Sequence, residues 1–259
     1  MKVAVAGGTG VAGRQAVAAL RGAGHEPVVL SRSTGVELVS GAGLDEALTG
    51  VDTVIDASNI SAQRAAVVKV FFEATSRNLM RAAARGGVRH IVALSIIGID
   101  HVPYGYYQGK VRQEEVLRDS QVPVSILRAA QFHEFPGQYL EWSSSRLVIV
   151  PKWRVQPVAA REVGDLLARL AVGAPVPMTQ LAGPTEERMA DLIRQVLVAR
   201  GERRQVLEVR LPGTTGRALA TGDGLPGPGV TLGTQTFADW LRSQAQHPSP
   251  IAPASGGAA

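Results

Sequence analysis

The sequence predicts an α/β fold, a doubly wound parallel sheet with a small C-terminal lobe, and two observations carry this prediction. A glycine-rich turn joins an apolar, strand-like run to a helical pattern within residues 3–20. Strand-like runs and helical patterns then alternate as far as residue 127. Because such alternation is typical of parallel sheets with right-handed crossovers, we expect helices on both faces of the sheet.

The first turn has the chemistry of a phosphate-binding loop. An apolar run at residues 3–6 leads into Gly7-Gly8-Thr9-Gly10-Val11-Ala12-Gly13, and a helical pattern follows at residues 14–20. Glycine permits backbone angles that a side chain forbids, and the helix N-terminus offers unpaired N–H groups to an anion. Strand, glycine turn and helix in this order indicate a Rossmann dinucleotide-binding fingerprint. The residues expected to contact the dinucleotide are Gly7, Thr9, Gly10, Val11 and Gly13.

The end of the second strand indicates which dinucleotide is bound. An apolar run at residues 26–30 is followed by Ser31-Arg32-Ser33-Thr34, where an NAD site usually carries an acidic residue for the ribose hydroxyl. An arginine can instead bind a phosphate through two parallel donors. We therefore expect Ser31, Arg32 and Ser33 to bind the 2′-phosphate of NADP(H), with NAD(H) as the open alternative.

The other elements of the first half follow in the expected order. Strands are predicted at residues 51–57, 88–95 and 122–127, and helices at residues 65–84 and 111–120. Only residues 36–39 are available for a further strand between the second and third strands, so we expect that strand to be brief.

The pattern loosens after residue 130, where the substrate-binding elements are expected to lie. Helices are predicted at residues 161–172, 186–200 and 236–244, a strand at 205–211, and a mobile glycine-rich loop at 213–233. We expect residues 1–245 to form a single NAD(P)-binding domain, with its substrate-binding elements mainly from 130–245. Residues 246–259, rich in Pro, Ser, Gly and Ala, are expected to be a disordered tail.

Composition excludes several classes of function. The net charge is +5, but the basic residues are scattered and only 5% of residues are aromatic, so no nucleic-acid groove is expected. The chain has no cysteine, and its five histidines lack paired ligand spacing, so neither a thiol nucleophile nor a metal is expected. No apolar stretch is long enough for a bilayer span, and a strand begins almost at Met1. These observations predict a cytoplasmic protein without a membrane partner; they leave the oligomeric state open.

A serine, a tyrosine and a lysine form the candidate catalytic set. Ser95 ends a predicted strand, and ligands of open α/β sheets bind outside the carboxyl ends of strands. Tyr106 and Lys110 are four residues apart and share one face if the segment is helical. A nearby ammonium lowers the pKa of a phenol, which then exchanges a proton with a carbonyl oxygen. We expect Tyr106 to move the proton, Lys110 to tune it and hold the nicotinamide ribose, and Ser95 to orient the carbonyl; Tyr107 is the alternative donor.

These motifs resemble the short-chain dehydrogenase/reductase superfamily, in particular its atypical, NmrA-like branch. The resemblance extends from residue 1 to about 245 and rests on the glycine turn, the loop after Asp56-Ala57, Ser95, Tyr106 to Lys110, and residues 127–135, 155–158 and 161–165. It implies further cofactor contacts from Ala57, Ser58, Ala130, Gln131 and Phe132. It also places the loop after residue 132 beside the substrate, so His133 and Tyr107 are expected in the substrate pocket.

The resulting functional hypothesis is an NADPH-dependent oxidoreductase that reduces a ketone or quinone of a small organic substrate. Two alternatives remain. One is a redox-sensing regulator that binds NADP(H) and a protein partner without turnover, against which the Ser-Tyr-Lys set argues. The other is an epimerase or dehydratase that uses bound NAD(P) as a transient oxidant. The chain is short for the sugar-nucleotide lobe of such enzymes, which argues against the last reading by analogy only.

Overall fold

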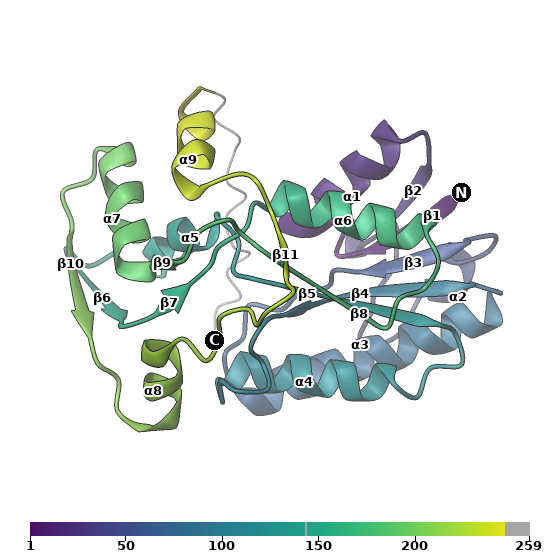
Figure 1. Cartoon of the computed structure of the whole chain (residues 1–259). Coiled ribbons are helices and arrows are strands. Elements are labelled where there is room, and N and C mark those ends of the chain that lie inside the picture. The colour runs from purple at the N-terminus through teal and green to yellow at the C-terminus, as the bar shows by residue number, and fades with distance from the viewer. Residues whose placement is uncertain (143, 247–259) are drawn as a thin grey trace. The chain divides into compact units, whose positions relative to one another are not determined.

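A computed structural model describes residues 1–142 and 144–246 of the chain (Figure 1). The chain divides into two compact units whose segments interleave along the sequence. Unit 1 consists of Met1–Ile96, Tyr104–Ala129 and Ala160–Gln180, and unit 2 consists of Ile97–Pro103, Ala130–Ala159 and the chain from Leu181 onward. The expectation of a single NAD(P)-binding domain over residues 1–245 stays a prediction. The predicted tail, apart from residue 246, lies outside the described residues.

A seven-stranded sheet confirms the predicted α/β class. Its strand order is β11-β8-β5-β4-β3-β1-β2. The strands are β1 (Lys2–Ala6), β2 (Glu26–Leu30), β3 (Thr53–Asp56), β4 (His90–Ile96), β5 (Val124–Ala129), β8 (Met178–Ala182) and β11 (Thr231–Leu232). The central strands pair in parallel, so their carboxyl ends lie along one edge. β8 begins in unit 1 and ends in unit 2, where Leu181 pairs with Thr231 of β11.

Helices cover both faces of the sheet in unit 1. Helices α1 (Val11–Gly22) and α6 (Ala160–Val172) pack together on one face, and α3 (Ala65–Arg85) and α4 (Gly105–Leu117) pack together on the other (Figure 1). The α1–α6 approach is close because Gly164 has no side chain; a Cβ there would lie 2.4 Å from the Cβ of Gln15. This doubly wound arrangement is the one that the alternating sequence pattern predicts.

The predicted brief strand at residues 36–39 is wrong. Glu37 and Ala42 form an isolated antiparallel bridge around a turn, and the short helix α2 (Leu44–Ala47) follows. The Asn78 side chain of α3 holds this turn by donating to the carbonyl oxygens of Leu38 and Val39, at 3.1 and 2.8 Å. The residues predicted as a strand therefore lie in a turn, and the Asn78 side chain holds this turn in place.

Unit 2 contains two small two-stranded sheets and four helices among its described residues. β6 (Leu147–Pro151) pairs in parallel with β10 (Gln205–Val209), and β7 (Arg154–Val155) pairs antiparallel with β9 (Glu187–Arg188). The helices are α5 (Phe135–Glu141), α7 (Met189–Arg200), α8 (Gly213–Thr221) and α9 (Phe237–Gln246). Buried side chains such as Leu140, Val150, Ile193 and Phe237 form the core of this unit.

The glycine-rich segment at residues 213–233 is not the loop that its composition predicts. It contains α8 and β11. At Gly216 a Cβ would lie 2.0 Å from the carbonyl oxygen of Leu211, so this glycine allows close packing of the helix. The sequence analysis also missed α5, β6 and β8, which are short and lack a strong periodic pattern. In the described part of the chain, no helix combines the length and apolar character needed to cross a membrane.

Candidate active site

The glycine turn after β1 brings backbone atoms closer than side chains would allow. Gly7 has a φ of +71°, and a Cβ there would lie 2.4 Å from the carbonyl oxygen of Ala57. A Cβ on Gly13 would lie 2.1 Å from the carbonyl oxygen of Gly7. Thr9 and Gly10 at the tip of the turn are exposed, and α1 begins directly after them. Because the first amides of a helix have no intrahelical acceptor, the turn offers N–H donors to a phosphate.

Ser58 provides a second observation that fits a bound polar ligand. Its Cα would lie 2.9 Å from a Cβ placed on Gly7, so it is next to the glycine turn. The residue is only 5% exposed, and its Oγ has no hydrogen-bond partner in the part of the chain that the structure describes. A buried hydroxyl without a partner is unusual in a folded protein. A dinucleotide in the glycine turn would give it one, so the residues present fit this cofactor.

The segment after β2 places a free guanidinium beside the glycine turn. Leu30 is paired with Ala6 across the β1–β2 ladder, so the next residues on both strands leave the sheet together. The Ser31 and Ser33 hydroxyl oxygens are 2.8 Å apart, and a one-turn 3₁₀-helix covers Arg32–Thr34. Arg32 is exposed, and its side chain pairs with no carboxylate among residues 1–142 and 144–246. It is therefore available to a phosphate on the ribose.

A buried polar network lies under the carboxyl ends of β3 and β4. Gln113 donates from Nε2 to Asp56 Oδ2 at 2.8 Å, and its Oε1 accepts from Lys110 Nζ at 2.8 Å. Lys110 Nζ also donates to the carbonyl oxygen of Leu94 at 2.9 Å and lies 4.2 Å from the centroid of the Phe72 ring. Its buried site lowers the pKa of Lys110 to about 8, although the charges of Asp56 and Glu114 act to raise it. The lysine is thus held inside the protein by three partners.

Ser95 belongs to a second buried group. Its hydroxyl donates to Glu114 Oε1 at 2.5 Å, and Ser95 is 2% exposed. Arg128 on β5 binds both oxygens of the Glu114 carboxylate, at 2.9 and 2.7 Å. This ion pair and the serine join α4 to β4 and β5. The expected place of Ser95 at a strand end is correct, but its hydroxyl is bonded within the protein.

Tyr106 lies in the first turn of α4 and is partly exposed. Its hydroxyl donates to Asn59 Oδ1 at 2.5 Å, and its ring packs edge-on against Phe72 with the centroids 5.9 Å apart. Burial raises the pKa of Tyr106 above its ordinary value, with smaller contributions in the same direction from Tyr107 and Asp56. The expectation that Lys110 lowers this pKa is wrong for this arrangement, because the ammonium donates to Leu94 and Gln113. The phenol stays protonated and can act as an acid.

Tyr107 and His133 occupy buried positions rather than open ones. Tyr107 is 6% exposed and packs edge-on against Tyr104. His133 is completely buried in unit 2, where its ring contacts Phe237 and Trp240 and its Nε2 lies 3.0 Å from the Pro157 carbonyl oxygen. These positions favour packing roles for both residues, and they make Tyr106 the accessible member of the tyrosine pair.

The strand-to-loop segment after β5 is fixed by backbone hydrogen bonds in unit 2. Ala130 is buried and donates its N–H to the Leu181 carbonyl oxygen at 2.9 Å. Gln131 and Phe132 are half-buried, and Phe132 forms an isolated parallel bridge with Val158. Their expected contacts with the nicotinamide stay a prediction.

The sequence analysis missed four residues of the site. Asp56, Asn59, Gln113 and Glu114 contact the three predicted catalytic side chains directly or through one another. A signal was present for two of them, because Gln113 and Glu114 lie three and four residues after Lys110 and so share its helix face. No comparable pattern marks Asn59, which lies in the irregular loop after β3.

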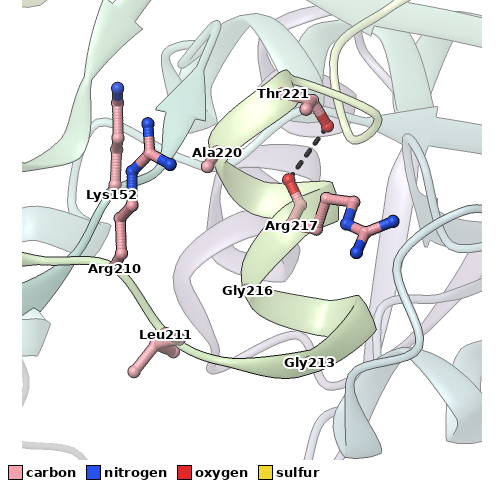
Figure 2. Close-up of a pocket in the computed structure, with 8 residues that line it drawn as sticks. All are labelled: Lys152, Arg210, Leu211, Gly213, Gly216, Arg217, Ala220 and Thr221. Atoms are coloured by element: carbon pink, nitrogen blue, oxygen red, sulfur yellow. Dashed lines mark hydrogen bonds between the residues drawn. The ribbon is translucent and has the colours of Figure 1, made fainter.

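A separate hollow of about 320 Å³ lies beside α8 in unit 2. Its lining consists of Lys152, Arg210, Leu211, Gly213, Gly216, Arg217, Ala220 and Thr221. The side chains of Lys152 and Arg210 run beside each other, whereas the Arg217 guanidinium points away from them (Figure 2). None of the predicted catalytic or cofactor residues lines this hollow, so it has no part in the site described above.

Comparison with known proteins identifies the class. The chain matches the NAD(P)H-binding family over residues 7–149, more than half of its length, and belongs to that family.

Two curated relatives are similar to this chain over part of its length. It is 30% identical over 186 residues to (4-alkanoyl-5-oxo-2,5-dihydrofuran-3-yl)methyl phosphate reductase of Streptomyces griseus, a match that covers 66% of this chain and 62% of that reductase. It is 32% identical over 155 residues to photosystem II assembly factor Ycf39 of Synechocystis, over 54% of this chain and 48% of that protein. The chain thus spans less than two thirds of the length of either relative.

Among similar solved structures is that of the NADPH-dependent quinone oxidoreductase of Escherichia coli complexed with NADPH. It shares 20% identity with this chain, with a TM-score of 0.65, and the match covers 93% of this chain and 99% of that one. At this identity the likeness shows the fold alone.

Proposed function

We propose that this protein is an NADPH-dependent reductase of the short-chain dehydrogenase/reductase type, in its NmrA-like branch, working on a ketone or quinone in the cytoplasm. The observation that carries the proposal is the Tyr106 phenol. It is partly exposed, keeps its proton, and follows β4 on the sheet edge at which the glycine turn follows β1. The named activities of the Streptomyces and Escherichia coli proteins, both reductions of small organic molecules, support the same reading.

The cofactor would be held by the backbone of the glycine turn and by the segment after β2. In this proposal the pyrophosphate contacts come from Gly7, Thr9, Gly10, Val11 and Gly13. The 2′-phosphate contacts come from Ser31, Arg32 and Ser33, which makes NADPH preferred over NADH. The contacts of Ala57, Ser58 and Lys110 with the cofactor, and those of Ala130, Gln131 and Phe132, are part of the proposal.

NADPH, when bound, would supply the hydride that the carbonyl carbon of the substrate needs. Tyr106 donates its phenolic proton to the carbonyl oxygen, so that the carbon gains a hydride and the oxygen gains a proton. Burial raises the pKa of Tyr106, so the phenol carries its proton at neutral pH. Lys110 and Gln113 hold the base of α4 against the Asp56 carboxylate and the end of β4, so they position Tyr106.

The test is a Tyr106→Phe variant assayed by NADPH consumption with a panel of ketones and quinones. We expect turnover to fall by about 100-fold or more, because general acid catalysis contributes about that much, while the NADPH Kd stays unchanged. Tyr104→Phe is the matched control, because Tyr104 precedes the same helix and its hydroxyl is bonded to Gln63. Turnover of Tyr106→Phe at the wild-type rate would remove Tyr106 from the reaction.

A second candidate is an NADP(H)-binding protein that acts on a protein partner without turnover. The observation that favours it is that the Ser95 and Lys110 side chains already make hydrogen bonds inside the fold. The similarity to a photosystem II assembly factor points in the same direction. Tight NADPH binding without consumption on the whole panel is the result that this candidate predicts.

A further inference from the structure

We propose that Asn59, rather than Ser95, is the second group that binds the substrate oxygen beside Tyr106. The inference rests on the proposed reductase function and names a catalytic residue outside the predicted Ser-Tyr-Lys set. It follows from the position of the Ser95 hydroxyl proton, the orientation of the Asn59 amide, and the exposure of the two side chains.

The Ser95 hydroxyl proton is already used inside the protein. It points to Glu114 Oε1 at 2.5 Å, and the carboxylate is in turn held by Arg128. Ser95 and Glu114 are each 2% exposed. A substrate oxygen that took this proton would leave a buried carboxylate oxygen with one donor fewer, which is costly. Ser95 is therefore poorly placed to orient a carbonyl.

The hydrogen bonds of Asn59 fix the orientation of its amide. Asn59 Oδ1 lies 2.8 Å from the N–H of Ile60 and 2.5 Å from the hydroxyl of Tyr106. Because a backbone N–H only donates, the atom at this position must be the amide oxygen. The Tyr106 hydroxyl must then be the donor, so its proton points towards Asn59.

The remaining half of the amide is free to bind a ligand. Asn59 is exposed, and its NH₂ group has no partner in the described ranges 1–142 and 144–246. The amide nitrogen is attached to the same planar group as the oxygen that holds the Tyr106 proton. A substrate oxygen that replaces Oδ1 at the Tyr106 hydroxyl is therefore within reach of the Asn59 N–H donors. Negative charge grows on that oxygen as the hydride adds to carbon, and fixed donors stabilise such charge.

A neighbouring contact provides a matched control. Gln63 lies in the same loop and accepts from the hydroxyl of Tyr104, just as Asn59 accepts from that of Tyr106. The loop is also close to the start of α4 there, since a Cβ on Gly105 would lie 2.3 Å from the Gln63 carbonyl oxygen. If these amides only hold the loop on the helix, substitution of either should have similar effects.

The experiment compares Asn59→Asp, Asn59→Ala and Gln63→Leu in the full chain, with a substrate that the wild type reduces. We expect kcat to fall by about 100-fold in both Asn59 variants, the usual loss for one oxyanion donor, with the NADPH Kd unchanged. Gln63→Leu should keep the wild-type kcat. The aspartate keeps acceptors for Ile60 and Tyr106 but has no N–H donor and adds a negative charge. Wild-type turnover in Asn59→Asp would therefore overturn the proposal, because it would show that holding the loop is all that Asn59 does.

A readout without turnover separates this inference from the proposed function. The chain has four tyrosines, so ¹⁹F NMR of protein labelled with 3-fluorotyrosine gives a small set of signals, and Tyr106→Phe assigns one of them. Asn59→Ala should shift the Tyr106 signal; an unchanged signal would overturn the proposal. No reduction of any substrate by the wild type would instead refute the reductase function itself, and the catalytic role of Asn59 with it.

Discussion

Replacing Glu114 with Gln should weaken the fold far more than the same change at Glu73. Both glutamates bind an arginine through two hydrogen bonds, Glu114 with Arg128 and Glu73 with Arg112. The pairs differ in burial: the Arg128 and Glu114 side chains are 9% and 2% exposed, and those of Arg112 and Glu73 are 34% and 35% exposed. The comparison therefore tests how strongly burial raises the cost of removing the charge of one partner.

The magnitude follows from the charge that remains. Glu114→Gln removes the negative charge that faces the buried Arg128 guanidinium, and breaking a buried pair in this way costs about 3–5 kcal/mol. The glutamine oxygen still accepts from Arg128 or Ser95, so we expect a loss of about 3 kcal/mol, near the lower end of that range. For a chain of this length such a loss lowers the midpoint of thermal unfolding by roughly 6–12 °C. In Glu73→Gln, Arg112 keeps its pair with Glu115 and is open to water, so the change should be much smaller.

The assay is thermal unfolding followed by circular dichroism, with chemical denaturation of the wild type and both variants to obtain the free energies of unfolding. Equal shifts in the midpoint for Glu114→Gln and Glu73→Gln would refute the reasoning, because they would show that the Glu114–Arg128 pair has no special effect on stability. A normal midpoint for Glu114→Gln would also contradict the placement of Ser95 in a structural group.

Two further predictions concern the cofactor and the buried lysine. Arg32→Ala should raise the Kd for NADPH by about 10–100-fold, the usual effect of losing a charged hydrogen bond, and leave the Kd for NADH unchanged. Fluorescence titration measures both constants, with a variant of an exposed arginine, Arg118→Ala, as the control. An equal rise in both constants for Arg32→Ala would contradict the contact with the 2′-phosphate. The pKa of Lys110 is lowered from 10.5 to about 8, so between these pH values the unfolded chain binds more protons than the folded protein. The contribution of Lys110 to the free energy of unfolding should therefore rise with pH, by about 3 kcal/mol in all. Denaturation of the wild type and Lys110→Met from pH 7.5 to 10 measures this contribution as a difference, and a difference that is constant with pH would exclude a lowered pKa of Lys110.

Local patterns in the sequence predicted the elements that depend on local physics. The glycine turn was recognised because each of its requirements, a positive φ at Gly7 and close backbone contact at Gly13, selects glycine. The shared face of Tyr106 and Lys110 follows from helical spacing alone, and α4 begins early enough to include both. The segment at 213–233 shows the limit of composition, because glycine in α8 serves close packing rather than a mobile loop.

The partners of the catalytic side chains depend on contacts between residues far apart in the sequence. Ser95 looked open because it ends a strand, but its acceptor is 19 residues away on another element. Lys110 looked like a partner of Tyr106, but the ends of β3 and β4 provide nearer acceptors through Gln113 and Leu94. No periodic pattern encodes such distant pairings, so the sequence identified the right segment of the chain and not the hydrogen bonds within it.

The measurement that tests the central claim most directly is NADPH oxidation at the nicotinamide absorbance band, with a ketone and quinone panel and product analysis. The account predicts that wild-type protein reduces at least one substrate, with one product molecule formed per NADPH consumed. It also predicts that Tyr106→Phe binds NADPH normally and has lost this turnover. Tight NADPH binding by the wild type without consumption on any substrate would contradict the reductase and favour the binding protein without turnover.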